Sequence, residues 1–211
     1  MAKPIVEYEK YDYSIVIVTI TSLPLDEFLL SGILAKKGYE IEPQKQPKII
    51  TAIKQNSKIT ISIEASKISI SSVNLFETLA ISDEIDKIIR KECNFDANRF
   101  QFVYQIAGQI ILGNAGNPIM SMKDNMISKT ANEEVSKIFG TPVSPDAIRL
   151  TNGDKFGSNY SQIQFQSRIG QENLAYYLDY IVRDTSKKAV DGFIKTSETK
   201  ILKFLNFIKS K

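Results

Sequence analysis

Histidine and cysteine, the side chains that most often carry enzyme chemistry near neutral pH, are almost absent from this sequence. Its 211 residues include no histidine and one cysteine, Cys93. Histidine is the commonest general base and transition-metal ligand, so its absence excludes triads with a histidine base and zinc sites that use imidazole. A single cysteine excludes an internal disulfide and an all-cysteine zinc site, and is typical of a reducing compartment. We therefore expect no metal and no cofactor.

Carboxylates and lysines are the remaining groups that could perform acid–base or covalent chemistry. Adjacent acidic residues occur at Asp26-Glu27, Asp83-Glu84 and Glu133-Glu134. Each pair falls in an expected first helical turn, where the helix dipole favours acidic side chains without any catalytic role. Neighbouring residues on a helix also point in different directions. We expect these pairs to be structural, and an enzyme with carboxylate or lysine chemistry is the least favoured of three functional interpretations.

Two loops have the composition of ligand-binding motifs without their spacing. Residues 111–120, ILGNAGNPIM, lack the Lys-Ser/Thr of a nucleotide-binding loop and the G-x-G-x-x-G spacing. Residues 151–159, TNGDKFGSN, lack the regular oxygen ligands and terminal glutamate of a calcium loop. We expect the first to be a turn after a strand and the second to connect a hairpin.

Composition points to a globular protein without a strong charge preference. Hydrophobic residues make up 43%, and 27 Lys and Arg against 24 Asp and Glu give a net charge of +3. This is well below the basic excess typical of nucleic-acid-binding proteins. The N-terminus has no secretory pattern, and no apolar run approaches the roughly 18 residues of a membrane span. We expect a cytoplasmic protein without a transmembrane segment.

Hydrophobic periodicity predicts the strands and helices that would position any functional site. In KITISIEASKISIS, residues 58–71, isoleucine alternates with small polar residues, which is typical of amphipathic strands. The isoleucines occupy odd positions before the turn and even positions after it, so the turn must reset the parity for both runs to face one core. The expected strands are 13–21, 48–55, 58–64, 68–73, 99–112, 147–151, 161–169 and 174–184. The expected helices are 22–38, 74–92 with a break near 81–82, 130–140 with a capping box from Thr130, and 186–210; residues 40–47 are expected to form a loop.

This order predicts an α+β fold in which helices pack on one face of an antiparallel sheet or sheets. Residues 1–95 and 96–211 each show strand, helix, three strands and helix, or βαβββα. Two interpretations are open: an internal duplication, or one continuous α+β domain.

The C-terminal helix has the sharpest amphipathic pattern. Apolar residues recur every three or four positions from Val190 to Ile208, interrupted by Ser197, and lysines fill the remaining surface. This seam could pack along the protein's own sheet, form a dimer or bind a membrane surface; we favour the first.

The first half resembles the TATA-box-binding protein family. GYEIEP at 38–43, followed by PKIITAIKQNSKITISIEASKISIS at 47–71, is similar to that family's loop and strands in order and polarity. The resemblance implies a duplicated saddle whose concave face carries Thr60, Ser62 and Ser69. The family's paired phenylalanines, which wedge between DNA bases, have no counterpart on these strands, and its Ser-Gly-Lys turn is EASK here.

We therefore expect a non-enzymatic binding or assembly protein. Its partner is expected to be a protein, including a second copy, rather than nucleic acid; a nucleic-acid-binding module is the alternative. The open sheet face should also carry Gln162, Gln164 and Gln166. The candidate contact residues lie on that sheet face and on the C-terminal helix: Thr60, Ser62, Ser69, Lys195, Lys200, Lys203 and Lys209.

Overall fold

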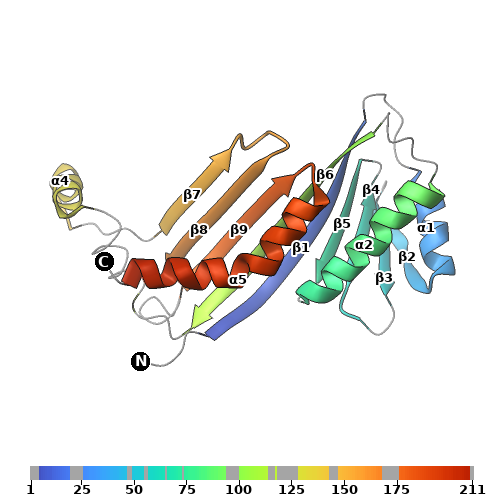
Figure 1. Cartoon of the computed structure of the whole chain (residues 1–211), viewed down its shortest axis with the longest axis horizontal. Helices are drawn as coiled ribbons and strands as arrows, with labels where there is room; N and C mark the ends of the chain where they lie inside the picture. Colours follow the sequence, from blue (N-terminus) through green and yellow to red (C-terminus); the bar gives the residue numbers. More distant parts are fainter. Residues whose placement is uncertain are drawn as a thin grey trace.

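Strand pairing joins both halves of the chain into one antiparallel sheet (Figure 1). The computed structural model describes residues 5–19, 26–46, 49–54, 57–64, 66–72, 74–93, 100–113, 117, 128–142, 147–167 and 176–209. The nine strands have the order β2-β3-β4-β5-β1-β6-β9-β8-β7. Their bounds are β1 Ile5–Thr19, β2 Tyr39–Gln46, β3 Ile49–Lys54, β4 Thr60–Glu64, β5 Lys67–Ser72, β6 Phe100–Gly113, β7 Ala147–Gly153, β8 Tyr160–Ser167 and β9 Tyr176–Asp184.

The helices that cover this sheet lie on a single face. Of the described helices, α1 (Glu27–Lys36), α2 (Leu75–Glu92) and α5 (Lys187–Lys209) pack on the side that faces the viewer in Figure 1. The fourth, α4 (Lys129–Phe139), stands away from the sheet. The predicted α+β class, with helices on one face of an antiparallel sheet, is confirmed.

The two halves meet at the centre of the sheet and repeat the same order outward. β1 pairs with β6 from Ile5 opposite Gly113 to Thr19 opposite Phe100, with one register shift between Tyr8 and Lys10. Outward from β1 lie β5, β4, β3 and β2, and outward from β6 lie β9, β8 and β7. The described part of the second half therefore has every strand of this order except a counterpart of β2.

The isoleucines of residues 58–71 form the core of the first half. Ile61 lies opposite Ile70 and Ile63 lies opposite Ile68, and all four are fully buried. The turn between β4 and β5 therefore resets the parity as predicted, because both runs of isoleucine face α2. In the second half, alternate residues of β6, β8 and β9 bury their side chains against α5; they include Ile106, Ile110, Phe165, Leu178 and Tyr180.

Some boundaries differ from the predictions. Residues 40–47 were expected to form a loop, but Tyr39–Gln46 forms strand β2. β2 lies at the edge of the sheet, where proline is tolerated because one side of the strand needs no donors. Pro43 falls where the register shifts between Glu42 and Gln46. α2 has no break at 81–82, because the Ser82 hydroxyl donates to the Leu79 carbonyl at 2.9 Å within a continuous helix.

The ends of the other helices follow ordinary capping chemistry. α4 begins two residues earlier than predicted, since Ser128 rather than Thr130 caps it and accepts from the Ala131 amide at 3.2 Å. It ends as predicted at Gly140, whose φ of 66° lies in the left-handed region. Asp26 caps α1, and Asn74 caps α2.

The amphipathic seam of α5 packs along the protein's own sheet, which confirms the favoured interpretation. Val190, Ile194, Ser197 and Ile201 are buried, and the Phe204 ring lies 4.5 Å from that of Phe165 on β8. Ser197 interrupts the apolar pattern at little cost, because its hydroxyl donates to the Ile194 carbonyl at 2.7 Å.

An ion-pair cluster ties α5 to α2 across the two halves. The Lys187 ammonium lies 2.5 Å from an Asp83 oxygen on α2 and 2.7 Å from an Asp191 oxygen on its own helix. Burial alone would lower the pKa of Lys187, but its hydrogen bonds to Asp191 and Asp83 raise it above the ordinary value.

Candidate interaction surface

The sheet has one face that none of the described helices covers, which we call the helix-free face. On the described strands, the side chains opposite the buried ones point to this face, since successive residues of a strand alternate. In the first half they include Thr51, Thr60, Ser62, Ser69 and Ser71, and in the second half Gln101, Gln105, Gln109, Arg149, Gln162, Gln164, Gln166, Tyr177, Asp179 and Arg183.

The predicted contact residues fall on two separate surfaces. Thr60, Ser62 and Ser69 lie side by side on the helix-free face of β4 and β5. Lys195, Lys200 and Lys203 are exposed on α5, on the other side of the sheet. Lys209 is the last residue of α5, and its side chain lies outside the described residues. One partner of modest size could therefore not touch both groups.

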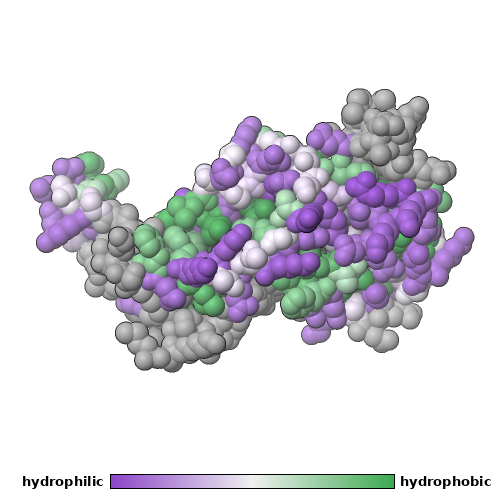
Figure 2. All heavy atoms as spheres, in the orientation of Figure 1, coloured by the Kyte–Doolittle hydropathy of each residue, from purple (hydrophilic) through white to green (hydrophobic). Residues whose placement is uncertain are grey.

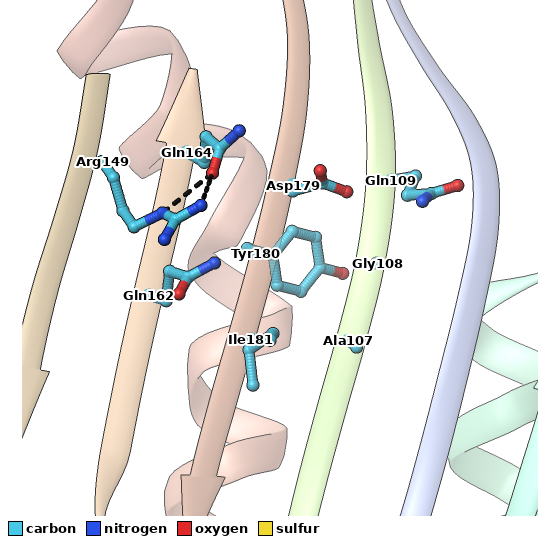
Figure 3. A pocket seen from close by; sticks show the side chains of 9 residues that line it. All are labelled: Ala107, Gly108, Gln109, Arg149, Gln162, Gln164, Asp179, Tyr180 and Ile181. Carbon is cyan, nitrogen blue, oxygen red and sulfur yellow. Dashed lines mark hydrogen bonds between the residues drawn. The ribbon is translucent and has the colours of Figure 1, made fainter. Parts of the chain in front are cut away.

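A row of long polar side chains crosses four strands of the second half (Figure 3). Strand register aligns Arg149, Gln164, Asp179 and Gln109 on β7, β8, β9 and β6. Arg149 donates to the Gln164 side-chain oxygen through Nε at 2.9 Å and Nη2 at 2.7 Å. Gln164 in turn donates to the Gln166 side-chain oxygen at 2.7 Å. These bonds hold the guanidinium and the amides in defined orientations.

A hollow lies beside this row, where the next row has Ala107 on β6 opposite Ile181 on β9. The Ala107 side chain is much shorter than that of Gln109, its neighbour on the same face of β6. The resulting cavity has a volume of about 480 Å³ and is lined by Ala107, Gly108, Gln109, Arg149, Gln162, Gln164, Asp179, Tyr180 and Ile181. It is a shallow site with amide donors and acceptors around an apolar floor.

Asp179 is the acidic group of this hollow. Burial raises the pKa of the Asp179 carboxyl above its ordinary value, and a hydrogen bond from the Gln109 side chain partly offsets that rise. Arg149 lies two strands away in the same row, so the hollow has a cationic and an anionic end.

A second group of hydrogen-bonded polar side chains, around Arg183, lies on the same face. The Arg183 guanidinium donates to the Gln105 side-chain oxygen at 2.9 and 2.7 Å, and to the carbonyls of Lys155 and Gly157 at 3.0 Å each. It therefore ties the turn between β7 and β8 to β6. The predicted hairpin at 151–159 is confirmed, and the Phe156 side chain at its tip is exposed.

The acidic pair Asp83-Glu84, considered for catalysis, has structural contacts in this fold. Asp83 pairs with Lys187, and Glu84 accepts from the Tyr39 hydroxyl at 2.9 Å. Cys93 is half-buried at the end of α2, and burial raises the pKa of its thiol to about 11, which opposes thiolate chemistry. Within the described ranges, no cluster of three or more acidic or cysteine side chains is placed to hold a metal ion. Residues 114–116 and 118–120 of the predicted glycine-rich turn lie outside the described residues.

The sequence pattern identified some residues of the helix-free face and missed others. The alternation of Gln162, Gln164 and Gln166 with buried neighbours placed them correctly on the open face. Arg149 and the glutamines of β6 were not identified as surface residues, although Gln101, Gln105 and Gln109 recur at intervals of four and so must share a strand face. No protein-family model matches the chain, and no curated protein matches it. None of the described helices has an apolar stretch long enough to cross a membrane.

Proposed function

We propose that this chain is a non-enzymatic binding or assembly protein whose partner lies on the helix-free face, centred on the hollow between β6 and β8. The observation that supports this is the placement of α1, α2 and α5 on the same side of the sheet, with ordered polar side chains on the other. An enzyme site would need convergent acid–base groups, whereas the charged groups that line the hollow, Arg149 and Asp179, lie two strands apart.

A protein partner fits the charge of this face better than nucleic acid. The described side chains of this face carry a nearly balanced set of charges, namely Lys67, Arg149 and Arg183 against Glu40, Glu42, Glu64 and Asp179. Nucleic-acid affinity depends on phosphate neutralisation by clustered cations, which this set does not supply. Glutamine side chains both donate and accept, so they can bind the peptide groups and polar side chains of another protein, including a second copy.

The resemblance to the TATA-box-binding protein family stays a proposal about the fold. The strand order supports it, since both halves are arranged outward from a central pair. In that family the corresponding face binds DNA, so nucleic acid is the alternative that the experiment must separate.

Site-specific photo-crosslinking tests the proposal. A photoreactive side chain replaces Gln162 on the helix-free face, and in a matched variant it replaces Lys195 on α5. Irradiation in an extract of the cells that contain the protein should give adducts from position 162 that protease removes and nuclease does not. Adding Ala107→Arg, which fills the hollow, should abolish them.

Two results would contradict the proposal. Adducts at position 162 that nuclease removes would assign the face to nucleic acid, as would binding to DNA or RNA that collapses when salt is raised. Equal adducts from positions 162 and 195, or none from 162, would show that the helix-free face is not a contact surface.

A further inference from the structure

α4 is an amphipathic helix whose apolar side is exposed. Val135, Ile138 and Phe139 share one side of the helix and are 40%, 78% and 70% exposed, and no residue of α4 is buried. Figure 1 shows the helix standing apart from the sheet. A helix of 11 residues is marginal by itself, because most helical stability in proteins comes from packing an apolar face.

The second half of the sheet has a partly exposed apolar strip on its helix side. On β7, Ile148 lies opposite Phe165 and Leu150 lies opposite Ile163, so the two β7 side chains continue the core layer outward. Leu150 is nevertheless 44% exposed. Figure 2 shows apolar surface beside α5 in this region, whereas polar side chains of α1 and α2 cover the first half.

The first half shows how such a strip is covered. There the helix that follows the central strand, α1, packs on β2, β3 and β4 and buries Leu30 and Leu34 completely. In the second half, α4 is the first described helix after the central strand β6, and β7 and β8 occupy the positions of β3 and β4. The exposed side of α4 and the apolar strip therefore correspond to the two surfaces that pack against each other in the first half.

The chain is long enough to bring them together. Six residues separate Gly140 at the end of α4 from Ala147 at the start of β7. Fully extended, the chain from the Cα of Gly140 to the Cα of Ala147 spans roughly 23–25 Å. The strip begins one residue beyond Ala147, so Ile138 and Phe139 can reach it. A short tether also gives α4 a high effective concentration at its own sheet compared with a second copy.

We propose that α4 docks through Val135, Ile138 and Phe139 on the strip formed by Ile148, Leu150 and Ile163 of its own chain. The helix then has two positions, the released one seen here and a closed one that completes the helical layer of the second half. This inference concerns the opposite side of the sheet from the proposed partner surface and does not depend on it.

Tryptophan fluorescence tests this directly, because the chain contains no tryptophan. Phe139→Trp places a reporter on α4, and Phe76→Trp is the matched control, since Phe76 is 80% exposed on α2. Docking predicts that Phe139→Trp emits at shorter wavelength and is quenched by acrylamide several-fold less than the control. Adding Leu150→Lys should remove both differences and leave Phe76→Trp unchanged.

Stability gives a second readout. Because docking buries the Ile138 side chain, Ile138→Lys should lower Tm by roughly 4–8 °C in a chain of this size. Phe76→Lys should lower it by less than roughly 2 °C. Equal emission and quenching from the two reporters would overturn docking. A blue shift that grows with protein concentration and accompanies a dimeric mass in light scattering would assign the strip to a second copy and overturn docking within one chain.

Discussion

Replacing Gly108 by alanine should destabilise the protein because the methyl group has no room. Gly108 lies on β6 directly opposite Tyr180 of β9, and the Tyr180 ring passes over it. A Cβ at this position would lie 2.5 Å from Cζ and Oη of the ring and 2.7 Å from Cε1. Ordinary contacts begin near 3.4 Å, so the ring would have to move by about 1 Å.

The ring cannot move without disturbing α5. Tyr180 is 1% exposed, and its ring lies 5.8 Å from that of Phe193 on α5. Overpacking of this kind costs about 1–3 kcal/mol. Alanine recovers about 0.4–1 kcal/mol by restricting the unfolded chain, so we expect a net loss of about 1–2 kcal/mol.

Urea unfolding followed by circular dichroism measures this loss as a lower midpoint with an unchanged slope. Gly32→Ala in α1 is the control, since no heavy atom lies within 4 Å of its added Cβ, and it should stabilise the helix by about 1 kcal/mol. Combining Gly108→Ala with Tyr180→Leu should cost less than the sum of the two single changes. Additive effects, or a Gly108→Ala protein as stable as the parent, would refute the close contact between Gly108 and Tyr180.

Three further predictions test the core, the charged contacts and the thiol. Ile61→Ala should lower the free energy of unfolding by about 2–5 kcal/mol. Ser62 follows Ile61 in the chain but points to the helix-free face, so Ser62→Ala should change it by less than about 0.5 kcal/mol. Similar losses from the two variants in urea unfolding would contradict the assignment of faces. Tyr104 donates to Asp86 at 2.7 Å and accepts from Arg90 at 2.6 Å, so Tyr104→Phe should cost about 1.5–3 kcal/mol. Burial and the bond to Asp86 raise the pKa of Tyr104 to about 12, so the folded state holds this proton more tightly; its contribution is complete below about pH 10 and is lost as pH rises toward 12. A urea midpoint that is constant over this range, or that falls equally in Tyr104→Phe, would be inconsistent with it. Cys93, with a pKa of about 11, should react with iodoacetamide at pH 8 far more slowly than free cysteine, and a rate equal to that of free cysteine would contradict its burial.

Helices and strands were predictable where apolar and polar side chains alternate clearly along the sequence. KITISIEASKISIS predicted two strands and their common core face, because isoleucine and hydroxyl residues alternate without exception within each run. β2 was missed because its charged residues, glutamines and proline leave little hydrophobic alternation at an edge strand. Its place depends on pairing with β3, which is a tertiary contact.

The residues of the candidate surface were likewise only partly predictable from the sequence. Alternation alone placed Gln162, Gln164 and Gln166 on the open face, since a buried residue fixes the direction of its neighbours. It could not place Arg149, Gln164, Asp179 and Gln109 in one row, because their alignment depends on the registers of three strand pairs.

By itself, the sequence determined the α+β class, most elements, the core isoleucines and the absence of histidine chemistry. These follow from local periodicity and composition, which need no knowledge of distant contacts. Only the tertiary structure decided that both halves share one sheet, through the long β1–β6 pairing. It also separated the hydroxyls of β4 and β5 from the lysines of α5, because the sheet itself lies between them, and it showed α4 standing apart from the sheet with its apolar side exposed.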